Sequence, residues 1–194
     1  MFYRDIILTV APRDVRYFMN QLLVLAHEKW SRLPVALTFP QWRSGTLNDP
    51  TVFDSRVSAA HPGNVLRVFS EQPEGLANLE ALWGIAELSA RRVTYLTPVL
   101  RAPLTEEGVA FFRVRRIDSV QHQKKRGTLE RRQALDDQLL AQRHEWLYVP
   151  LSSVSTGQDF SLFVGRAEGR VSSHIDVGSF GFSRSGAPCY LPSF

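Results

Sequence analysis

The first hundred residues alternate short apolar runs with longer segments of helical periodicity, and this order restricts the possible folds more than any other feature of the sequence. In the first helical segment, Val15, Phe18, Leu22 and Leu25 recur at helical spacing. Expected strands cover residues 3–10, 33–40, 65–70 and 92–100, and expected helices cover about 13–31 and about 74–88. Strand, helix, strand, strand, helix, strand is the ferredoxin-like order. The sequence therefore predicts an α+β protein with a ferredoxin-like domain at residues 1–100.

The remaining residues, 101–194, predict a second mixed α/β domain. The stretch "RAPLTEEG" after Leu100 is a plausible junction, because proline, glycine and polar residues are typical of domain boundaries. Expected elements are strands at 110–115, 145–151 and 159–166 and a helix at 128–144, followed by a glycine-punctuated end. A chain of 194 residues with 44% hydrophobic residues can bury one large core or two small ones.

The sequence favours a soluble, cytoplasmic protein. The apolar run Ile6–Val10 is too short for a secretion signal, and no window approaches the roughly 18 apolar residues of a spanning helix. Cys189 is the only cysteine, so neither an intramolecular disulfide nor a cysteine zinc cage can form. A buried thiol is the preferred interpretation of Cys189, and a nucleophilic role is the alternative.

Common catalytic motifs are absent. His27-Glu28 and His144-Glu145 begin like the zinc motif HExxH, but Ser31 and Tyr148 occupy the second histidine position. The run "GFSRS" lacks the last glycine of a nucleophile elbow, and no glycine loop precedes a Walker lysine. We therefore expect no metal and no cofactor.

The charge is concentrated in one tract, residues 111–132. Eight basic residues against two acidic ones give this tract +6, and because the whole chain carries +4, the other residues carry −2. The basic residues are Arg113, Arg115, Arg116, Lys124, Lys125, Arg126, Arg131 and Arg132. A basic tract on a slightly acidic body is typical of proteins that bind a polyanion such as RNA. A solvated basic loop or helix face is the alternative.

His27 lies at the edge of the apolar stripe of the first helical segment. With Leu22 at zero on a wheel of about 100° per residue, His27 falls near 140°, beside Asn20 and Arg16. His27 is thus not expected in the core. A histidine late in a helix is often only a partner of the helix dipole, so a functional role needs a second component.

The stretch "SVSTGQDF" supplies this component. Ser153, Ser155 and Thr156 bring hydroxyl groups, and Gly157 permits the close backbone approach that an anion or a sugar needs. In the strand that follows, Phe160, Leu162 and Val164 alternate as the inward face. A serine-rich loop before an edge strand is the alternative interpretation.

These motifs resemble the CRISPR-associated repeat-processing endoribonucleases of the type I-F systems. Members of this family have a serine-x-serine-threonine-glycine-glutamine run before a strand with phenylalanine, here "SVSTGQDF". The helix "LLVLAHEKW" is similar to the leucine-rich helix that ends in the family's catalytic histidine, and "FGFSRSG" is similar to its glycine-rich end. The resemblance covers nearly the whole chain.

The resemblance implies a metal-independent enzyme that binds a CRISPR repeat stem-loop, cuts at its 3′ base and stays bound as a subunit of a surveillance complex. The catalytic residues would be His27 and Ser153, and Phe180 would neighbour the active site where the family often has a tyrosine. RNA contacts are expected from Ser155, Thr156, Gln158, Phe160, Gln121, Arg115, Arg116, Lys124, Lys125, Arg126, Arg131 and Arg132. Whether His27 acts as base or acid stays open.

The chemistry agrees with these residue types. RNA carries its own nucleophile, the 2′-hydroxyl, and a histidine can take up or release a proton near neutral pH. Cleavage then gives a 2′,3′-cyclic phosphate and a 5′-hydroxyl. Two alternatives remain: a hairpin-binding cap with little or no cleavage activity, and an unrelated RNA-binding α/β protein.

Overall fold

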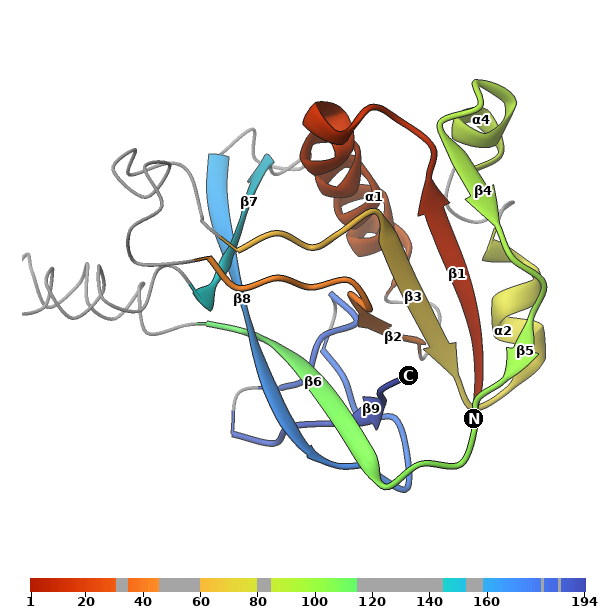
Figure 1. Ribbon diagram of the computed structural model, residues 1–194, viewed down its shortest axis with the longest axis vertical. Coiled ribbons are helices and arrows are strands. Elements are labelled where there is room, and N and C mark those ends of the chain that lie inside the picture. Colours follow the sequence, from red (N-terminus) through yellow and green to blue (C-terminus); the bar gives the residue numbers. More distant parts are fainter. Residues whose placement is uncertain are drawn as a thin grey trace, which may run out of the picture. The chain divides into compact units, whose positions relative to one another are not determined.

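The computed structural model shows a mixed α+β protein with two antiparallel sheets (Figure 1). The structure describes residues 1–30, 35–45, 60–79, 85–114, 145–152, 159–178, 180–184 and 186–194. Two compact units make up the chain: the first is Met1–Trp42, Pro62–Phe112 and Arg166–Phe194, and the second is Arg43–His61 and Arg113–Gly165. The α+β class is confirmed, while the domain boundary at residue 100 stays a prediction.

The first sheet has β1 at its centre, as Figure 1 shows. Its strands are β1 (Phe2–Leu8), β2 (Val35–Thr38), β3 (Val65–Ser70), β4 (Thr94–Leu96) and β5 (Leu100–Arg101). They follow the order β2-β3-β1-β4, and β5 also pairs with β1. Both ends of β3 agree with the prediction from sequence.

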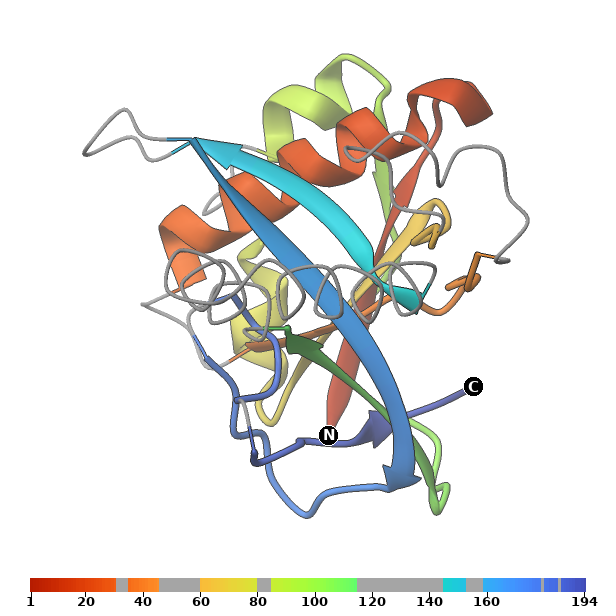
Figure 2. The same cartoon turned by 90° about the vertical axis from the view of Figure 1, so that its left-hand side faces the viewer.

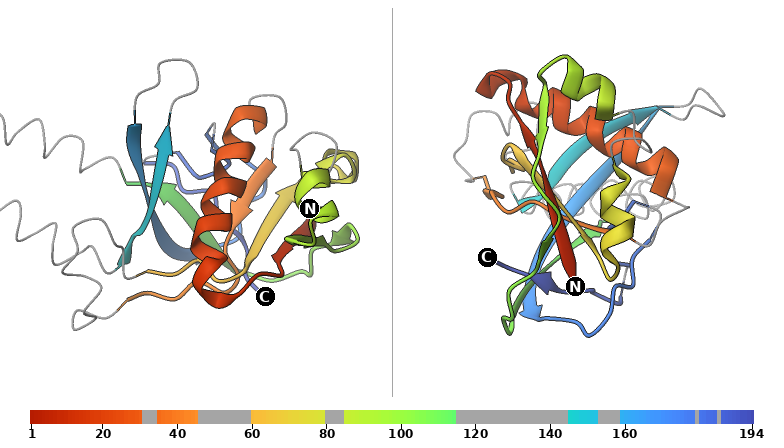
Figure 3. Two further views of the ribbon diagram at one scale, coloured as in Figure 1. Left: turned by 90° about the horizontal axis from the view of Figure 1, so that it is seen from above. Right: turned by 90° about the vertical axis from the view of Figure 1, so that its right-hand side faces the viewer.

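Helices cover one face of this sheet. The chain passes from β1 through a short 3-10 turn, Pro12–Asp14, into α1 (Val15–Trp30). Ile6 and Leu8 of β1 are buried on the helical face. Arg4 lies on the same face by strand alternation, and its Nη1 donates to the carbonyl of Leu76 in α2 (Pro73–Ala77). Figure 3 (right) shows α1 and α2 on the same side of β1.

The helix expected from about residue 74 to 88 is not continuous, so this prediction was wrong. The helix α2 ends at Ala77, and a separate helix, α4, covers Ile85–Ala90. Arg4 donates to the carbonyls of Leu76 and Ala77 at 3.2 and 3.5 Å. Because a cation that bonds the last carbonyls of a helix stabilises its end, this long-range contact favours termination at Ala77.

The strand expected at 92–100 is also divided. Only Thr94–Leu96 and Leu100–Arg101 are strands, and Pro98 between them has no N–H to donate to a ladder. Arg92 instead has a positive φ of 57°. Its N–H bonds the carbonyl of Ser89 and the N–H of Val93 bonds that of Leu88, so Arg92 belongs to the C-terminal cap of α4.

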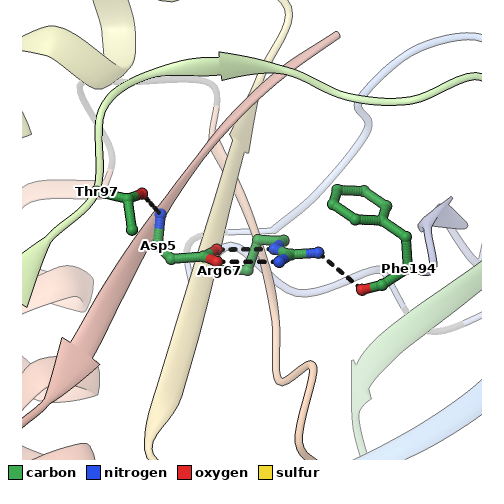
Figure 4. Close-up of polar contacts among 4 residues, drawn as sticks. All are labelled: Asp5, Arg67, Thr97 and Phe194. Carbon is green, nitrogen blue, oxygen red and sulfur yellow. Dashed lines mark hydrogen bonds and ion pairs between the residues drawn. The ribbon is translucent and has the colours of Figure 1, made fainter.

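The C-terminal segment packs on the other face of the first sheet. Cys189 and Leu191 are buried in one cluster with Ala36 of β2 and Phe69 of β3. On the same face, Arg67 forms a bidentate ion pair with Asp5 of β1, at 2.7 and 2.9 Å. Arg67 also donates to the carbonyl of Phe194 at 3.0 Å (Figure 4).

The second sheet follows the order β7-β8-β6-β9. Its strands are β6 (Glu107–Arg113), β7 (Leu147–Ser152), β8 (Asp159–Arg170) and β9 (Leu191–Pro192). The strand β8 continues four residues beyond the predicted end at Arg166, and Figure 2 shows its length beside β7. The strand β9 was not predicted from sequence. It has only two residues, one of them proline.

In the second unit, the side-chain alternation expected for β8 is confirmed at Leu162, Phe163 and Val164. Leu162 and Val164 are fully buried, as is Val149 of β7. Phe163 points to the opposite side, where its ring lies 5.3 Å from that of Tyr148. Beyond these strands, the helix predicted at residues 128–144 lies outside the described residues.

Candidate active site

His27 lies late in α1, beside the buried side of that helix. Among residues 15–27 of α1, the buried ones are Val15, Met19, Leu22, Leu23 and Ala26. His27 itself is only half-buried, as its position on the helical wheel predicts. The helix thus holds the imidazole at the boundary between the core and the surface.

Backbone hydrogen bonds among Gly178, Gly181 and Phe182 form a turn that holds Phe180. The N–H of Gly181 donates to the carbonyl of Gly178 at 3.0 Å, and the N–H of Gly178 donates to the carbonyl of Phe182 at 2.8 Å. Gly181 has a φ of 68°, which favours glycine at this point of the turn. The carbonyl of Gly181 accepts a bond from the N–H of Leu37 in β2, at 2.8 Å. The turn is therefore fixed to the first sheet.

The rings of His27 and Phe180 stack face to face. Their centroids are 3.8 Å apart and their planes differ by 6°. Both residues belong to the first unit. Two residues far apart in the sequence, each assigned to the active site on separate motifs, are thus in contact. The stack covers one face of the imidazole, while the two ring nitrogens lie in the ring plane and are not used by it.

Most of the other predicted site residues lie outside the described residues. These are Ser153, Ser155, Thr156, Gln158, Gln121, Arg115, Arg116, Lys124, Lys125, Arg126, Arg131 and Arg132. Phe160 belongs to β8, where it is paired with Leu151 of β7. Their roles stay predictions.

Cys189 is a buried thiol, which confirms the preferred interpretation from sequence. Only 4% of the residue is exposed, and its Sγ donates to the carbonyl of His174 at 3.5 Å. Burial raises the pKa of the thiol above its ordinary value of 9.0. Because the thiolate is the reactive form, this environment opposes a nucleophilic role.

Within the described ranges, no group of three or more histidine, cysteine, aspartate or glutamate residues could hold a metal ion. In the same part of the chain, no helix is long and apolar enough to cross a membrane.

The comparison with protein families identifies a CRISPR-associated protein. The family model described as CRISPR-associated protein (Cas_Csy4) matches residues 16–194, so the chain belongs to this family. Its general function is the processing of CRISPR repeat RNA by an endoribonuclease, as the resemblance implied. No curated protein matches the chain.

Proposed function

We propose that the protein cleaves a CRISPR repeat stem-loop at the 3′ base of its stem without a metal ion. In this reaction the 2′-oxygen attacks the adjacent phosphorus and the bond from phosphorus to the 5′-oxygen breaks. One proton leaves the 2′-hydroxyl and one reaches the departing 5′-oxygen. The products are a 2′,3′-cyclic phosphate and a 5′-hydroxyl.

The His27–Phe180 stack carries this proposal. It joins the histidine of the leucine-rich helix to the glycine-rich segment, the two regions that the family resemblance assigns to the active site. In the proposal His27 transfers a proton at the reacting oxygens, and Ser153 holds the attacking 2′-hydroxyl. Phe180 is a positioning residue, because a phenyl ring has no proton to exchange.

The remaining assignments belong to the same proposal. The order β2-β3-β1-β4 with intervening helices supports a ferredoxin-like domain in residues 1–100, followed by an RNA-recognition domain in residues 101–194. The basic linker, the hydroxyl-rich loop and Phe160 would bind the hairpin, and the protein would remain on its product within a type I-F surveillance complex.

The test uses the purified protein and the repeat RNA of its own CRISPR array in EDTA. The unaltered protein should cut at the 3′ foot of the hairpin, and His27→Ala should slow cutting by about 10²–10⁴-fold, the usual contribution of a general acid or base. A 2′-deoxy nucleotide at the cut site should abolish cutting, since it removes the nucleophile. Full cutting by His27→Ala, or cutting of the 2′-deoxy RNA, would contradict the proposed chemistry.

A second candidate function is a hairpin-binding cap with little or no cleavage. One observation favours it: Phe180 brings no hydroxyl group to His27, where the family often has a tyrosine. Tight hairpin binding by the unaltered protein without cutting, under the same conditions, would establish this alternative. Restoration of cutting by Phe180→Tyr would then identify the missing hydroxyl as the cause.

A further inference from the structure

The strand β4 forms an open edge of the first sheet. In the order β2-β3-β1-β4 it is the last strand, and β5 continues beside β1 at the same margin. Figure 1 shows β4 and β5 on the outer side of β1, with no described strand beyond them. Because one side of its backbone has no neighbouring strand, β4 can pair with a strand from another chain.

The backbone of Leu96 faces this edge. The N–H of Thr97 donates to the carbonyl of Asp5 at 3.0 Å. Three residues before Leu96, the carbonyl of Val93 accepts a bond from Thr9 of the chain after β1, at 2.9 Å. Residues of an antiparallel pair alternate between bonding their partner strand and pointing away from it, so the N–H and carbonyl of Leu96 point away from β1. Among the residues that the structure describes, none bonds these two groups.

The edge has apolar side chains where natural proteins often place charged ones to prevent pairing. Residues 93–100, VTYLTPVL, contain no charged residue. Tyr95 and Leu100 are 56% and 45% exposed. The register places Tyr95 opposite Ile7 and Leu100 opposite Tyr3, so both side chains lie on the same face of the sheet. The edge therefore offers an apolar contact beside its backbone groups.

Two exposed arginine residues flank the uncharged tract. Arg92 precedes it and Arg101 follows it. A strand that adds to this edge would thus meet positive charge near both of its ends. Acidic residues at the ends of that strand would complement this charge.

We propose that an extended segment of another protein subunit adds to this edge as a further strand of the first sheet. The segment would have apolar side chains at alternate positions and acidic residues at its ends. A polypeptide is favoured over RNA, because a second strand matches the alternating backbone groups and the tract itself has no cation for phosphate. The inference rests on the proposed function, since it takes the protein as a subunit of a surveillance complex.

The first experiment measures hydrogen exchange at single backbone amides by mass spectrometry. Three samples are compared: the free protein, the protein with its repeat RNA hairpin, and the complex assembled from all protein subunits encoded with its CRISPR array. The amide of Leu96 should exchange at least about tenfold more slowly in the assembled complex than in the other two samples. The amide of Tyr95 is the internal control, because it lies in the ladder with β1 and should change little.

The second experiment uses Tyr95→Lys, which places a charge beside the edge and removes an exposed aromatic side chain. The variant and the unaltered protein carry different tags and compete, in equal amounts, for incorporation into the complex. We expect the complex to contain about tenfold less of the variant, a loss typical of an aromatic residue that anchors an interface. The melting temperature of the variant and its Kd for the repeat RNA should stay unchanged, because the side chain is exposed.

Tyr17→Lys is the matched control. It makes the same change at a tyrosine that is 62% exposed and belongs to α1, outside the proposed edge. We expect Tyr17→Lys and the unaltered protein to be incorporated equally.

Four results would overturn the inference. Unchanged exchange of the Leu96 amide in the complex, or equal incorporation of Tyr95→Lys, would show that the edge takes up no subunit. Slower exchange with the RNA hairpin alone would identify RNA as the occupant. Slower exchange in the free protein at higher concentration would identify a second copy of this chain.

The proposed function is read separately, from cutting of the repeat RNA by the free protein in EDTA. If the protein joins the complex but does not cut, cleavage is refuted and the Leu96 amide still decides the inference. If the protein cuts the RNA but does not join the other subunits, cleavage stands and this inference fails.

Discussion

Two aromatic residues of the C-terminal segment contact the rest of the first unit in very different surroundings. At Phe194, Arg67 is held on every side: two nitrogens bond Asp5, a third bonds the carbonyl of Phe194, and the rings of Phe194 and Tyr3 lie 4.1 and 4.6 Å from the guanidinium. At Phe180, the contact is a ring stack on the half-buried His27.

In our proposal, the first contact fixes the chain and the second positions the imidazole that transfers a proton. The Arg67 side chain is 10% exposed and that of Asp5 14%. Each charge is therefore stabilised by the other, because removal of one would leave its partner nearly buried and uncompensated. The Phe180 stack orients the imidazole through its face and does not use its nitrogens, which is what proton transfer requires. We therefore expect variants at the first contact to change stability and variants at the second to change cleavage.

The largest effect is expected for Arg67→Met. This change leaves the carboxylate of Asp5 nearly buried without its partner and removes the bond to Phe194. Breaking a buried ion pair in this way typically costs about 3–5 kcal/mol in the free energy of unfolding. Chemical denaturation measures the loss, and the initial rate of cutting by the fraction that remains folded should stay close to the unaltered value.

The double variant Asp5→Leu/Arg67→Met is the control for this prediction. It removes both charges, so most of the lost stability should return, because an apolar pair can replace a buried ion pair at little cost. If the double variant is as unstable as Arg67→Met, the bond to Phe194 and the ring contacts hold the segment, and the ion pair does not.

The second contact is tested with Phe180→Leu. Leucine keeps an apolar side chain but loses the flat ring, so the imidazole is no longer held in one plane. We expect kcat to fall by about tenfold with KM nearly unchanged, because a misplaced catalytic group slows the reaction more than it weakens binding. The melting temperature should fall only slightly, since an aromatic ring pair contributes about 0.5–1.5 kcal/mol.

Phe180→Tyr serves as the conservative variant, because it keeps the ring. It should retain or exceed the original kcat. Loss of activity in both variants would show that the turn at residues 178–182 tolerates no change at this position, and the stack would then have no separate role in orienting His27.

The sequence predicted the described strands of the first sheet well where the pattern is local. Short apolar runs located β1, β2 and β3, and helical spacing placed His27 beside the buried face of α1. It failed in two places: at residues 92–100, where Pro98 divides the expected strand, and at the end of α2, where a distant residue makes a contact. At the end of α2, Arg4 from the first strand bonds the carbonyls of Leu76 and Ala77, and no local pattern contains this contact.

At the candidate site, too, the sequence predicted some features and missed others. The family motifs indicated His27 and Phe180 separately, but only the fold shows that their rings stack. The helical wheel also placed Asn20 near His27. The burial of the Asn20 side-chain oxygen without a hydrogen-bond partner, however, depends on tertiary packing, which helical periodicity does not describe. The pairing of Asp5 with Arg67 was missed as well, although β1 and β3 were both predicted, because their register follows from the assembled sheet.

The smallest effect concerns Cys189, which lies between the two aromatic contacts and packs against Ala36 and Phe69. Burial raises the pKa of this thiol, so the folded protein keeps the thiol proton at a pH where the unfolded chain has lost it. The stability that the buried, protonated thiol contributes is therefore fully present below its ordinary pKa of 9.0, and it is lost as the pH rises toward the folded pKa.

We expect denaturation curves from pH 8 to 10 to show a free energy of unfolding that falls above about pH 9, by no more than about 1.4 kcal/mol per pH unit. Cys189→Ala should lack this part of the decline, whatever constant offset its smaller side chain introduces. Parallel pH profiles for the two proteins would mean that the thiol is solvated in the folded state, and the segment between Phe180 and Phe194 would then not be packed tightly on the sheet.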